Sequence, residues 1–363
     1  MWDPRDHLPE ATAAFCLERG GTEATARRLL SAVLADDRFD PEDWTRFHQV
    51  PRRVVEAVGT LPRLRLDRVV RSKVDGFRKL RFLTADDLAL ESVLIPLNKP
   101  GTASVCLSSQ VGCVMGCTFC ATARMTRRRN LATWEILDQW QQARALARQD
   151  GVRISGVVFM GMGEPFLNYD RVLTAAELLS CSFAGRTAAK AITISTVGLV
   201  PEIDRFTQEG RRFRLSISLG AATDAKRAEL VPVAAKTPIR EVMAAARRHA
   251  LDRRDRVMLS YVCISGRNVG EDDAQALGDL IGDTRVRLDL IDVTDPTGTF
   301  APPTSEELTT FRDALSRYVG QPVVRRYSGG ADIQASCGTL AGVDSLDGAA
   351  SKSSITSDLL ILP

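Results

Sequence analysis

Three cysteines, Cys113, Cys117 and Cys120, follow one another with the spacing C-x3-C-x2-C. Three thiolates on one tight loop can bind three irons of a [4Fe–4S] cluster, which leaves the fourth iron open to a small molecule. A structural zinc site is one alternative, but zinc takes four ligands there and no fourth Cys or His lies nearby. A disulfide is the other, and it is disfavoured because the polar N-terminus does not resemble a secretory signal. We therefore predict a cluster site.

A glycine-rich turn with the sequence MGMGEP follows an apolar stretch and occupies residues 160–165. Glycines let the backbone approach a ligand closely, and the carboxylate of Glu164 can accept hydrogen bonds from an ammonium group. Taken alone, this pattern fits any turn from a strand into a loop. Downstream of a cluster loop, it indicates the site for the amino group of S-adenosylmethionine (SAM), the molecule that radical SAM enzymes hold at the open iron.

The bulk composition excludes several classes of protein. Apolar residues make up 44% of the 363 residues and charged residues 26%, as in an ordinary globular protein. No run of 18 apolar residues occurs, so we expect no membrane span and a cytoplasmic location. A net charge of +3 is too small to announce a nucleic-acid binder. With only His7, His48 and His249, a Ser-His-Asp triad or a His-rich metal site is not expected.

Strand and helix patterns alternate from residue 102 onward, which implies a parallel α/β sheet that is closed or partly closed. Reactive groups of such barrels sit at the C-terminal ends of the strands, and the cysteine loop follows the first strand. The strands are expected at 103–107, 154–160, 190–196, 212–219, 256–263, 286–293 and 322–327. The helices are expected at 132–149, 169–180, 238–252, 271–282 and 304–319.

The N-terminal part of the chain, residues 1–85, is expected to be a small helical accessory domain. Thr22 can cap one helix, Pro41 lies near the start of a second, and Pro51 begins a third. This part fits an RNA-binding module and a plain helical cap equally well. Residues 66–97 alternate apolar and polar side chains, as strands or hairpins do, and join this domain to a barrel domain spanning 86–343. Residues 344–363 have no periodicity and are expected to form a C-terminal tail.

The motifs together resemble those of the RlmN/Cfr family of radical SAM methyl synthases, which methylate adenine carbons in RNA. The resemblance covers about residues 88–343, in the family's order, with VCLSSQVGC, MGMGEPFLN, ISTVGLVP, SISL, LVPV and DIQASCGTLAG as the matching stretches. It implies a partial (β/α)6-type radical SAM barrel, a [4Fe–4S] cluster and SAM as cofactors, and ribosomal or transfer RNA as the partner.

The resemblance also assigns roles to individual residues. Cys337 is implied as the methyl-carrying cysteine, Cys106 as its partner, and Glu91 as a proton acceptor, although the spacing from Glu91 to Cys106 is longer than expected. The alternative for the two cysteines is a pair of inert buried thiols. Cys16, Cys181 and Cys263 lie outside any such motif and are assigned to packing. Contacts to SAM are implied for Gly163, Glu164, Ser195, Ser218, Leu219, Gly220 and Asp295.

The implied reaction has two halves. The Cys337 thiolate first takes a methyl group from one SAM by displacement. A second SAM, cleaved at the cluster, gives a radical that removes hydrogen from this methyl group, and the carbon radical adds to C2 or C8 of adenine. Cys106 then attacks the Cys337 sulfur, which forms a disulfide and releases the product, while Glu91 or Cys106 takes the ring proton. An external reductant reopens the disulfide, and a flavodoxin- or ferredoxin-type electron donor is the expected partner.

Four departures from the family pattern bear on the substrate. Gly220 stands where His is usual, Asp295 where Asn is usual, and Thr339 where Gln is usual. Residues 328–330, with the sequence SGG, lack the usual Arg that can pair with phosphate. Three hypotheses follow: methylation of an RNA adenine, the same radical chemistry on a small molecule or peptide, and a non-catalytic iron–sulfur protein. Retention of both Cys106 and Cys337 argues against the third, and RNA is preferred as the family default.

Overall fold

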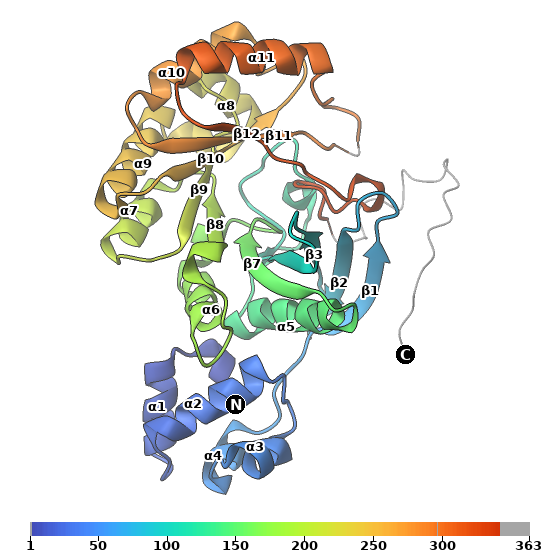
Figure 1. Ribbon diagram of the computed structural model, residues 1–363, viewed down its shortest axis with the longest axis vertical. Helices are drawn as coiled ribbons and strands as arrows, with labels where there is room; N and C mark the ends of the chain where they lie inside the picture. The colour runs from blue at the N-terminus through green and yellow to red at the C-terminus, as the bar shows by residue number, and fades with distance from the viewer. Residues whose placement is uncertain (1, 296, 342–363) are drawn as a thin grey trace.

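Ten strands form one open sheet through the middle of the molecule (Figure 1). The structure, a computed structural model, describes residues 2–295 and 297–341. In spatial order the strands are β1 (Arg65–Arg71), β2 (Arg78–Leu83), β3 (Ala89–Pro96), β4 (Thr102–Cys106), β7 (Arg153–Phe159), β8 (Ile192–Thr196), β9 (Arg214–Ser218), β10 (Val257–Cys263), β11 (Val286–Asp292) and β12 (Val323–Arg325). A separate two-stranded ribbon pairs β5 (Gln110–Val111) with β6 (Arg129–Asn130).

In the main sheet, β4 and the strands from β7 to β12 run parallel to one another, which confirms the predicted α/β fold. No pairing closes the sheet between β12 and β1 in the described part of the chain, as in a partial barrel. Strands β1 to β4 pair antiparallel with their neighbours. The sequence predicted strands or hairpins in this region but not that they would extend the main sheet.

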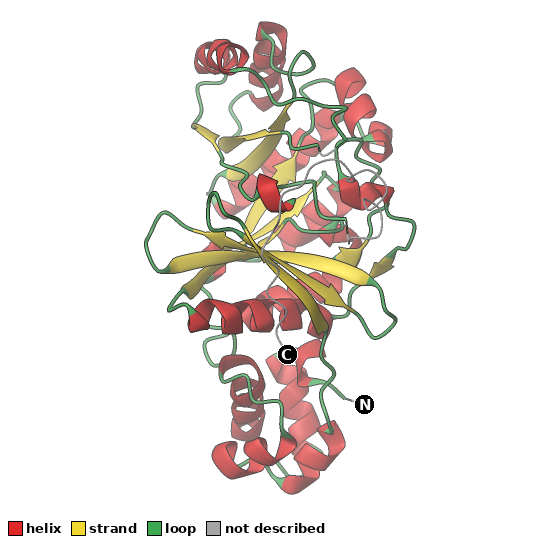
Figure 2. Cartoon of the chain, turned by 90° about the vertical axis from the view of Figure 1, so that its right-hand side faces the viewer, coloured by secondary structure: helices red, strands yellow, loops and turns green. Residues whose placement is uncertain are grey.

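Helices connect the parallel strands and pack around the sheet (Figure 2). They are α5 (Thr133–Gln149), α6 (Tyr169–Ser180), α7 (Val200–Gln208), α8 (Asp224–Leu230), α9 (Ile239–Arg253), α10 (Glu271–Ile281) and α11 (Ser305–Tyr318). The short helices α7 and α8 were not predicted. Short 3-10 turns are found at Pro4–Asp6, Ala121–Arg124, Pro165–Asn168, Ala189–Ala191, Pro232–Lys236 and Ala331–Ile333.

Four helices make up the N-terminal end of the molecule, below the sheet in Figure 1. They are α1 (Pro9–Leu17), α2 (Glu23–Leu30), which runs on into a π-turn at Ser31–Ala35, α3 (Pro41–His48) and α4 (Arg52–Val58). The predicted starts of α2 and α3 are confirmed, because the Thr22 and Asp40 side chains accept hydrogen bonds from the first-turn backbone N–H groups of these helices. Helices fill only the first part of residues 1–85, and β1 and β2 fill the last.

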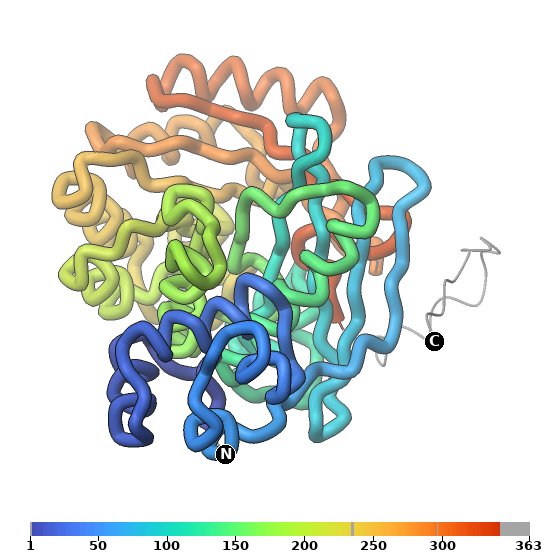
Figure 3. Tube along the Cα trace, turned by 60° about the horizontal axis from the view of Figure 1, so that its bottom comes forward, coloured from blue at the N-terminus to red at the C-terminus, as the bar shows by residue number. Residues whose placement is uncertain are grey.

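A buried ion cluster attaches the N-terminal helices to the rest of the molecule. Arg5 is fully buried. It forms an ion pair with Asp3 at 2.8 Å and lies 3.5 Å from Asp138 on α5. Asp138 also accepts from Arg63 at 2.6 Å. The tube in Figure 3 shows the N-terminal helices gathered against the α5 and α6 side of the sheet. Such a desolvated network holds two elements in one relative position because no member can leave without stranding a buried charge that has lost its partner.

Two further predictions concerned a C-terminal tail and membrane-spanning segments. The tail predicted at 344–363 lies outside the described residues. Across the part of the chain that the structure describes, no helix combines the length and apolar character needed to cross a membrane.

Candidate active site

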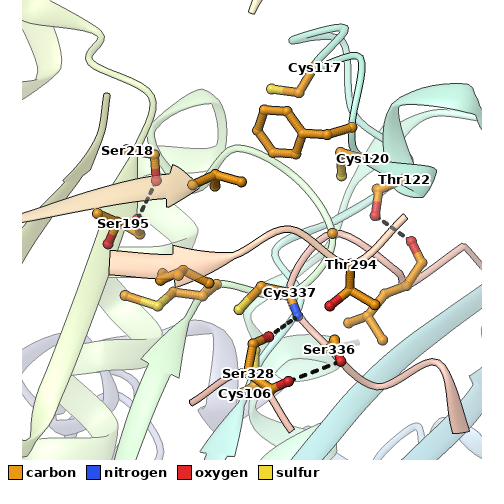
Figure 4. Close-up of a pocket in the computed structure, with 18 of the residues that line it drawn as sticks. Cys106, Cys117, Cys120, Thr122, Ser195, Ser218, Thr294, Ser328, Ser336 and Cys337 are labelled. Atoms are coloured by element: carbon orange, nitrogen blue, oxygen red, sulfur yellow. Dashed lines mark hydrogen bonds between the residues drawn. The ribbon is translucent and has the colours of Figure 1, made fainter. Parts of the chain in front are cut away.

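A cavity of about 220 Å³ opens at the C-terminal ends of the parallel strands (Figure 4). Its walls come from β4 and β7 to β11, from the cysteine loop, and from the segment that follows β12. Of the residues predicted to do chemistry, the cavity is lined by Cys106, Cys117, Cys120, Gly163, Glu164, Ser195, Ser218, Gly220 and Cys337. Residues from five separate stretches of sequence therefore meet in one place.

The cysteine loop is fixed by bonds to the neighbouring chain. The backbone N–H of Thr118 donates to the Leu230 carbonyl at the end of α8 over 3.0 Å. Cys113 is buried, whereas Cys117 and Cys120 are half-buried and reach the cavity. Burial raises the pKa of the Cys117 thiol, and negative charge on Cys120 and Cys113 raises it further. The three cysteines therefore influence one another electrostatically on a single loop.

The donor set fits a [4Fe–4S] cluster. Within residues 2–295 and 297–341, no three His, Cys, Asp or Glu side chains converge on the position of a single metal ion. A cluster makes a different demand, because each thiolate binds its own iron and the sulfurs spread around the cube. Three cysteines on one loop beside an open cavity would satisfy this demand and would leave the fourth iron without a ligand from this loop.

The segment that carries Cys337 is bonded directly to the cysteine loop. The Ala121 N–H donates to the Gly338 carbonyl over 2.7 Å, and the Thr122 hydroxyl donates to the Leu340 carbonyl over 2.5 Å. The Cys337 N–H donates to the Ser328 hydroxyl over 3.0 Å. The backbone on both sides of Cys337 is therefore held, while its thiol remains exposed in the cavity.

Cys106 and Cys337 approach each other across the cavity wall (Figure 4). Cys106 ends strand β4 and is 7% exposed. Burial raises the pKa of its thiol to about 12, and negative charge on Cys337 contributes to this rise. Both residues line the same cavity. The structure thus brings together two cysteines that are far apart in sequence.

The glycine-rich turn after β7 holds Glu164 in a fixed orientation. One carboxylate oxygen of Glu164 accepts from the Phe166 N–H and the other from the Val197 N–H, each over 2.9 Å. Burial raises the pKa of this carboxyl to about 7. Gly163 has φ +100°, and a Cβ there would lie 2.6 Å from the Gln110 Cβ, so only glycine fits. A buried carboxylate beside a cavity favours a cationic ligand group, such as the ammonium of SAM.

The SAM-contact residues predicted in and next to the ISTVGLVP and SISL stretches divide between cavity and core. The hydroxyl oxygens of Ser195 and Ser218 lie 3.3 Å apart at the cavity wall. Gly220 also lines the cavity, whereas Leu219 is buried and is not among the lining residues. The Leu219 carbonyl accepts from the buried Arg227 over 3.1 Å, which fixes the turn that presents Gly220.

Besides Cys113 and Leu219, the predicted residues Glu91 and Asp295 also lie outside the cavity wall. Glu91 is 1% exposed, pairs with Lys79 at 3.1 Å and accepts from the Ala341 N–H at 3.1 Å. Asp295 accepts from the backbone N–H groups of Thr297 and Phe300 over 3.0 and 3.1 Å. Both carboxylates thus hold loops in place, and their predicted roles toward proton transfer and SAM stay predictions.

Several cavity residues were not found from the sequence. Arg326 lines the cavity, lowers the pKa of the Cys106 thiol electrostatically, and donates to the Met160 sulfur over 3.3 Å. Phe77 arrives from the β1–β2 hairpin and packs edge-on against Tyr327. The adjacent Arg325 and Arg326, at the end of the last strand, were a visible signal for Arg326. Nothing local in the sequence indicated that Phe77 would reach the site.

Comparisons with known proteins agree with this fold and site. The Radical SAM superfamily model matches residues 107–277. A "Probable RNA methyltransferase" of Myxococcus xanthus is 45% identical over 322 residues, which cover 88% of each chain. A "Probable dual-specificity RNA methyltransferase RlmN" of Thermotoga neapolitana is 34% identical over 92% of this chain and 95% of the relative. The crystal structure of a radical SAM methyltransferase from Sphaerobacter thermophilus superposes with a TM-score of 0.85 at 32% identity, covering 94% of this chain and 100% of the other.

The fold and the site define a radical SAM enzyme, one that depends on SAM and a [4Fe–4S] cluster. Within that class, the chain belongs to the RlmN/Cfr family of radical SAM methyltransferases, as its motifs implied.

Proposed function

We propose that this enzyme methylates a ring carbon of adenine, C2 or C8, in ribosomal or transfer RNA, with Cys337 as the methyl carrier. The RNA substrate is inferred from the relatives, which are named as RNA methyltransferases. The observation that carries the proposal is the shared cavity, which Cys337, Cys106, Cys117 and Cys120 all line. The small-molecule alternative has no comparable support from these relatives.

Each cysteine of the cavity has a separate task in this proposal. The cluster, bound by Cys113, Cys117 and Cys120, supplies the electron that starts radical chemistry on SAM. The exposed Cys337 thiol is accessible to a methyl donor. Cys106 is its neighbour, so it can attack the Cys337 sulfur and release the methylated base as the two sulfurs join in a disulfide.

The surrounding residues bind and orient the reactants. Glu164 faces the SAM ammonium group, while Ser195, Ser218 and the backbone at Gly163 and Gly220 form the rest of the binding wall. Arg326 provides a positive charge beside Cys106, which favours the attacking thiolate.

The proposal requires an external electron donor and a reducing compartment. The oxidised cysteine pair must be reduced after each turnover, and the cluster needs electrons, so an external donor of the flavodoxin or ferredoxin type is required. Free thiols in the cluster loop need a reducing compartment, which favours the cytoplasm. We also propose a division into an accessory domain within 1–85 and a barrel domain at 86–343, although β1 and β2 of the first range pair into the barrel sheet. The tail predicted at 344–363 lies outside the described residues.

The test uses SAM with an isotope-labelled methyl group and the cluster-reconstituted protein. Mass spectrometry of digested protein is expected to find one labelled methyl on the peptide that contains Cys337. Adding ribosomal or transfer RNA and reductant is expected to move the label to adenine. Cys337→Ala is expected to abolish both signals, whereas Cys181→Ala, which changes a half-buried cysteine outside the cavity, is expected to preserve them. Label on Cys337 with none on RNA would instead favour a small-molecule substrate.

A further inference from the structure

A second cavity, of about 420 Å³, lies where α5 ends and β7 begins. Four arginines line it: Arg144 and Arg148 from α5, Arg153 from the start of β7, and Arg186 from the loop before β8. This places the cavity at the N-terminal ends of the parallel strands, beside the N-terminal helices and opposite the cysteine cavity (Figure 1). The proposed methyl transfer uses none of these residues.

The charges around this second cavity are not balanced. Asp37 pairs with Arg144, and with Arg148 at 3.0 Å. Across residues 2–295 and 297–341, Arg153 and Arg186 form no ion pair with a carboxylate. Asp36, which lies 3.6 Å from His48, also attracts Arg144 electrostatically. Two carboxylates therefore face four guanidinium groups, and the cavity carries an excess of positive charge.

A further carboxylate near the rim is already engaged elsewhere. Asp150, at the end of α5, pairs with Arg78 and lies 3.4 Å from Arg71 on strand β1. It cannot offset the charge of Arg153 and Arg186 without leaving these partners. Asp150 therefore does not neutralise the excess positive charge of the cavity.

Two buried donors on the cavity lining also lack acceptors. The Arg144 Nε and the Trp140 Nε1 have no hydrogen-bond partner among the described residues. Arg144 is 7% exposed, and its guanidinium stacks on the Trp140 ring at 3.9 Å. A buried donor without an acceptor costs about 1–3 kcal/mol, so folded proteins rarely leave one unsatisfied. These unpaired donors add to the positive potential of the lining, which favours an acceptor-rich ligand in the cavity.

We propose that this cavity binds a phosphate group. Guanidinium groups match phosphate oxygens in a planar, two-pronged geometry, and phosphate offers acceptors without competing donors. The group can come from the backbone of a bound RNA or from a free phosphate ester. The proposal depends on the cavity alone and not on which substrate is methylated.

The experiment uses the full-length protein and two probes. Isothermal titration calorimetry measures inorganic pyrophosphate binding, and fluorescence anisotropy measures binding of a single-stranded RNA oligonucleotide at fixed salt. The test variant is Arg153→Ala/Arg186→Ala, which removes two exposed side chains from the cavity. The matched control is Arg240→Ala/Arg312→Ala, which removes two exposed arginines from α9 and α11 and changes the net charge equally. Thermal melting confirms that all three proteins are folded.

We expect the test variant to bind pyrophosphate about tenfold or more weakly than the wild type, because each charge-assisted bond contributes at least a factor of that order. The control is expected to match the wild type. A parallel loss of RNA affinity identifies the RNA backbone as the source of the phosphate, and unchanged RNA affinity identifies a free phosphate ester. The proposal is overturned if the wild type does not bind pyrophosphate, as when only water fills the cavity, or if both variants bind it equally.

Discussion

The backbone N–H of Ala121 donates to the carbonyl oxygen of Gly338 over 2.7 Å. These residues directly follow Cys120 and Cys337, so a backbone hydrogen bond joins the cysteine loop to the C-terminal cysteine. The Thr122 hydroxyl adds a second link, to the Leu340 carbonyl. The position of Cys337 relative to the cluster loop is therefore set by the fold itself, before any ligand binds.

Removal of the second link tests its contribution. Thr122→Val deletes the hydroxyl and leaves the Leu340 carbonyl without this donor, so we expect the free energy of unfolding to fall by about 1–3 kcal/mol. Methylation of Cys337 is expected to slow as well, because the segment can move. Urea denaturation and a labelled-methyl time course measure the two effects. Thr122→Ser keeps the hydroxyl and is the control; equal behaviour of the two variants would argue against the link.

The cluster assignment leads to a spectroscopic prediction. Cys117→Ala removes one of three ligands, so reconstituted protein is expected to lose the visible iron–sulfur absorbance and most of its bound iron. Cys263→Ala changes a fully buried cysteine outside the cavity and is expected to retain both. A Cys117→Ala protein with normal absorbance and iron content would contradict the assignment of this loop.

Glu91 is predicted to stabilise the fold, independently of its predicted role as a proton acceptor. Its carboxylate and the Lys79 ammonium form a pair that is almost wholly buried, with exposed side-chain fractions of 1% and 11%. Glu91→Ala leaves this Lys79 charge with one fewer partner, and we expect a loss of about 3–5 kcal/mol in urea denaturation. In the double variant Glu91→Ala/Lys79→Met, part of the loss is expected to return. Strict additivity of the single changes would show that the pair contributes little.

The buried carboxyl of Glu164 predicts a pH dependence of stability. Burial raises its pKa from 4.5 to about 7 in the folded protein. Between these values the folded state holds a proton that the unfolded state has lost, so stability falls as the pH rises from about 4.5 to about 7. Glu164→Gln cannot titrate, and its stability relative to the wild type is therefore expected to rise over this range. Urea denaturation of both apoproteins at a series of pH values measures the difference; a constant difference would contradict the raised pKa.

Much of the fold followed from local patterns in the sequence. Helix α6 was predicted at its observed bounds, because its apolar positions repeat at helical spacing and turn residues flank it. Thr22 capped its helix as expected, and Pro41 begins α3 as expected, with Asp40 as an additional cap. Helices α7 and α8 were missed because nine and seven residues are too few to give a clear period. The addition of β1 to β3 to the main sheet depends on non-local pairing, which no local pattern encodes.

The site, too, was predicted partly from local sequence patterns and partly only from family resemblance. The cysteine spacing alone indicated a cluster loop, whereas the roles of Cys106 and Cys337 came only from family resemblance. Their approach depends on strand β4 and on the hydrogen bonds after Cys120, which join segments more than 200 residues apart. Arg326 was missed because its importance is its position beside Cys106 and not its residue type.

The most direct test of the account is a trapping measurement with Cys106→Ala. If Cys106 releases the product from Cys337, reconstituted Cys106→Ala protein given SAM, reductant and substrate RNA will retain the RNA adenine covalently attached through the former methyl carbon to Cys337. Mass spectrometry of nuclease- and protease-digested protein is expected to find this adduct on the Cys337 peptide, and to find none with the wild type or with Cys106→Ala/Cys337→Ala. Free methylated RNA from Cys106→Ala at the wild-type rate, with no adduct, would contradict the paired roles of the two cysteines.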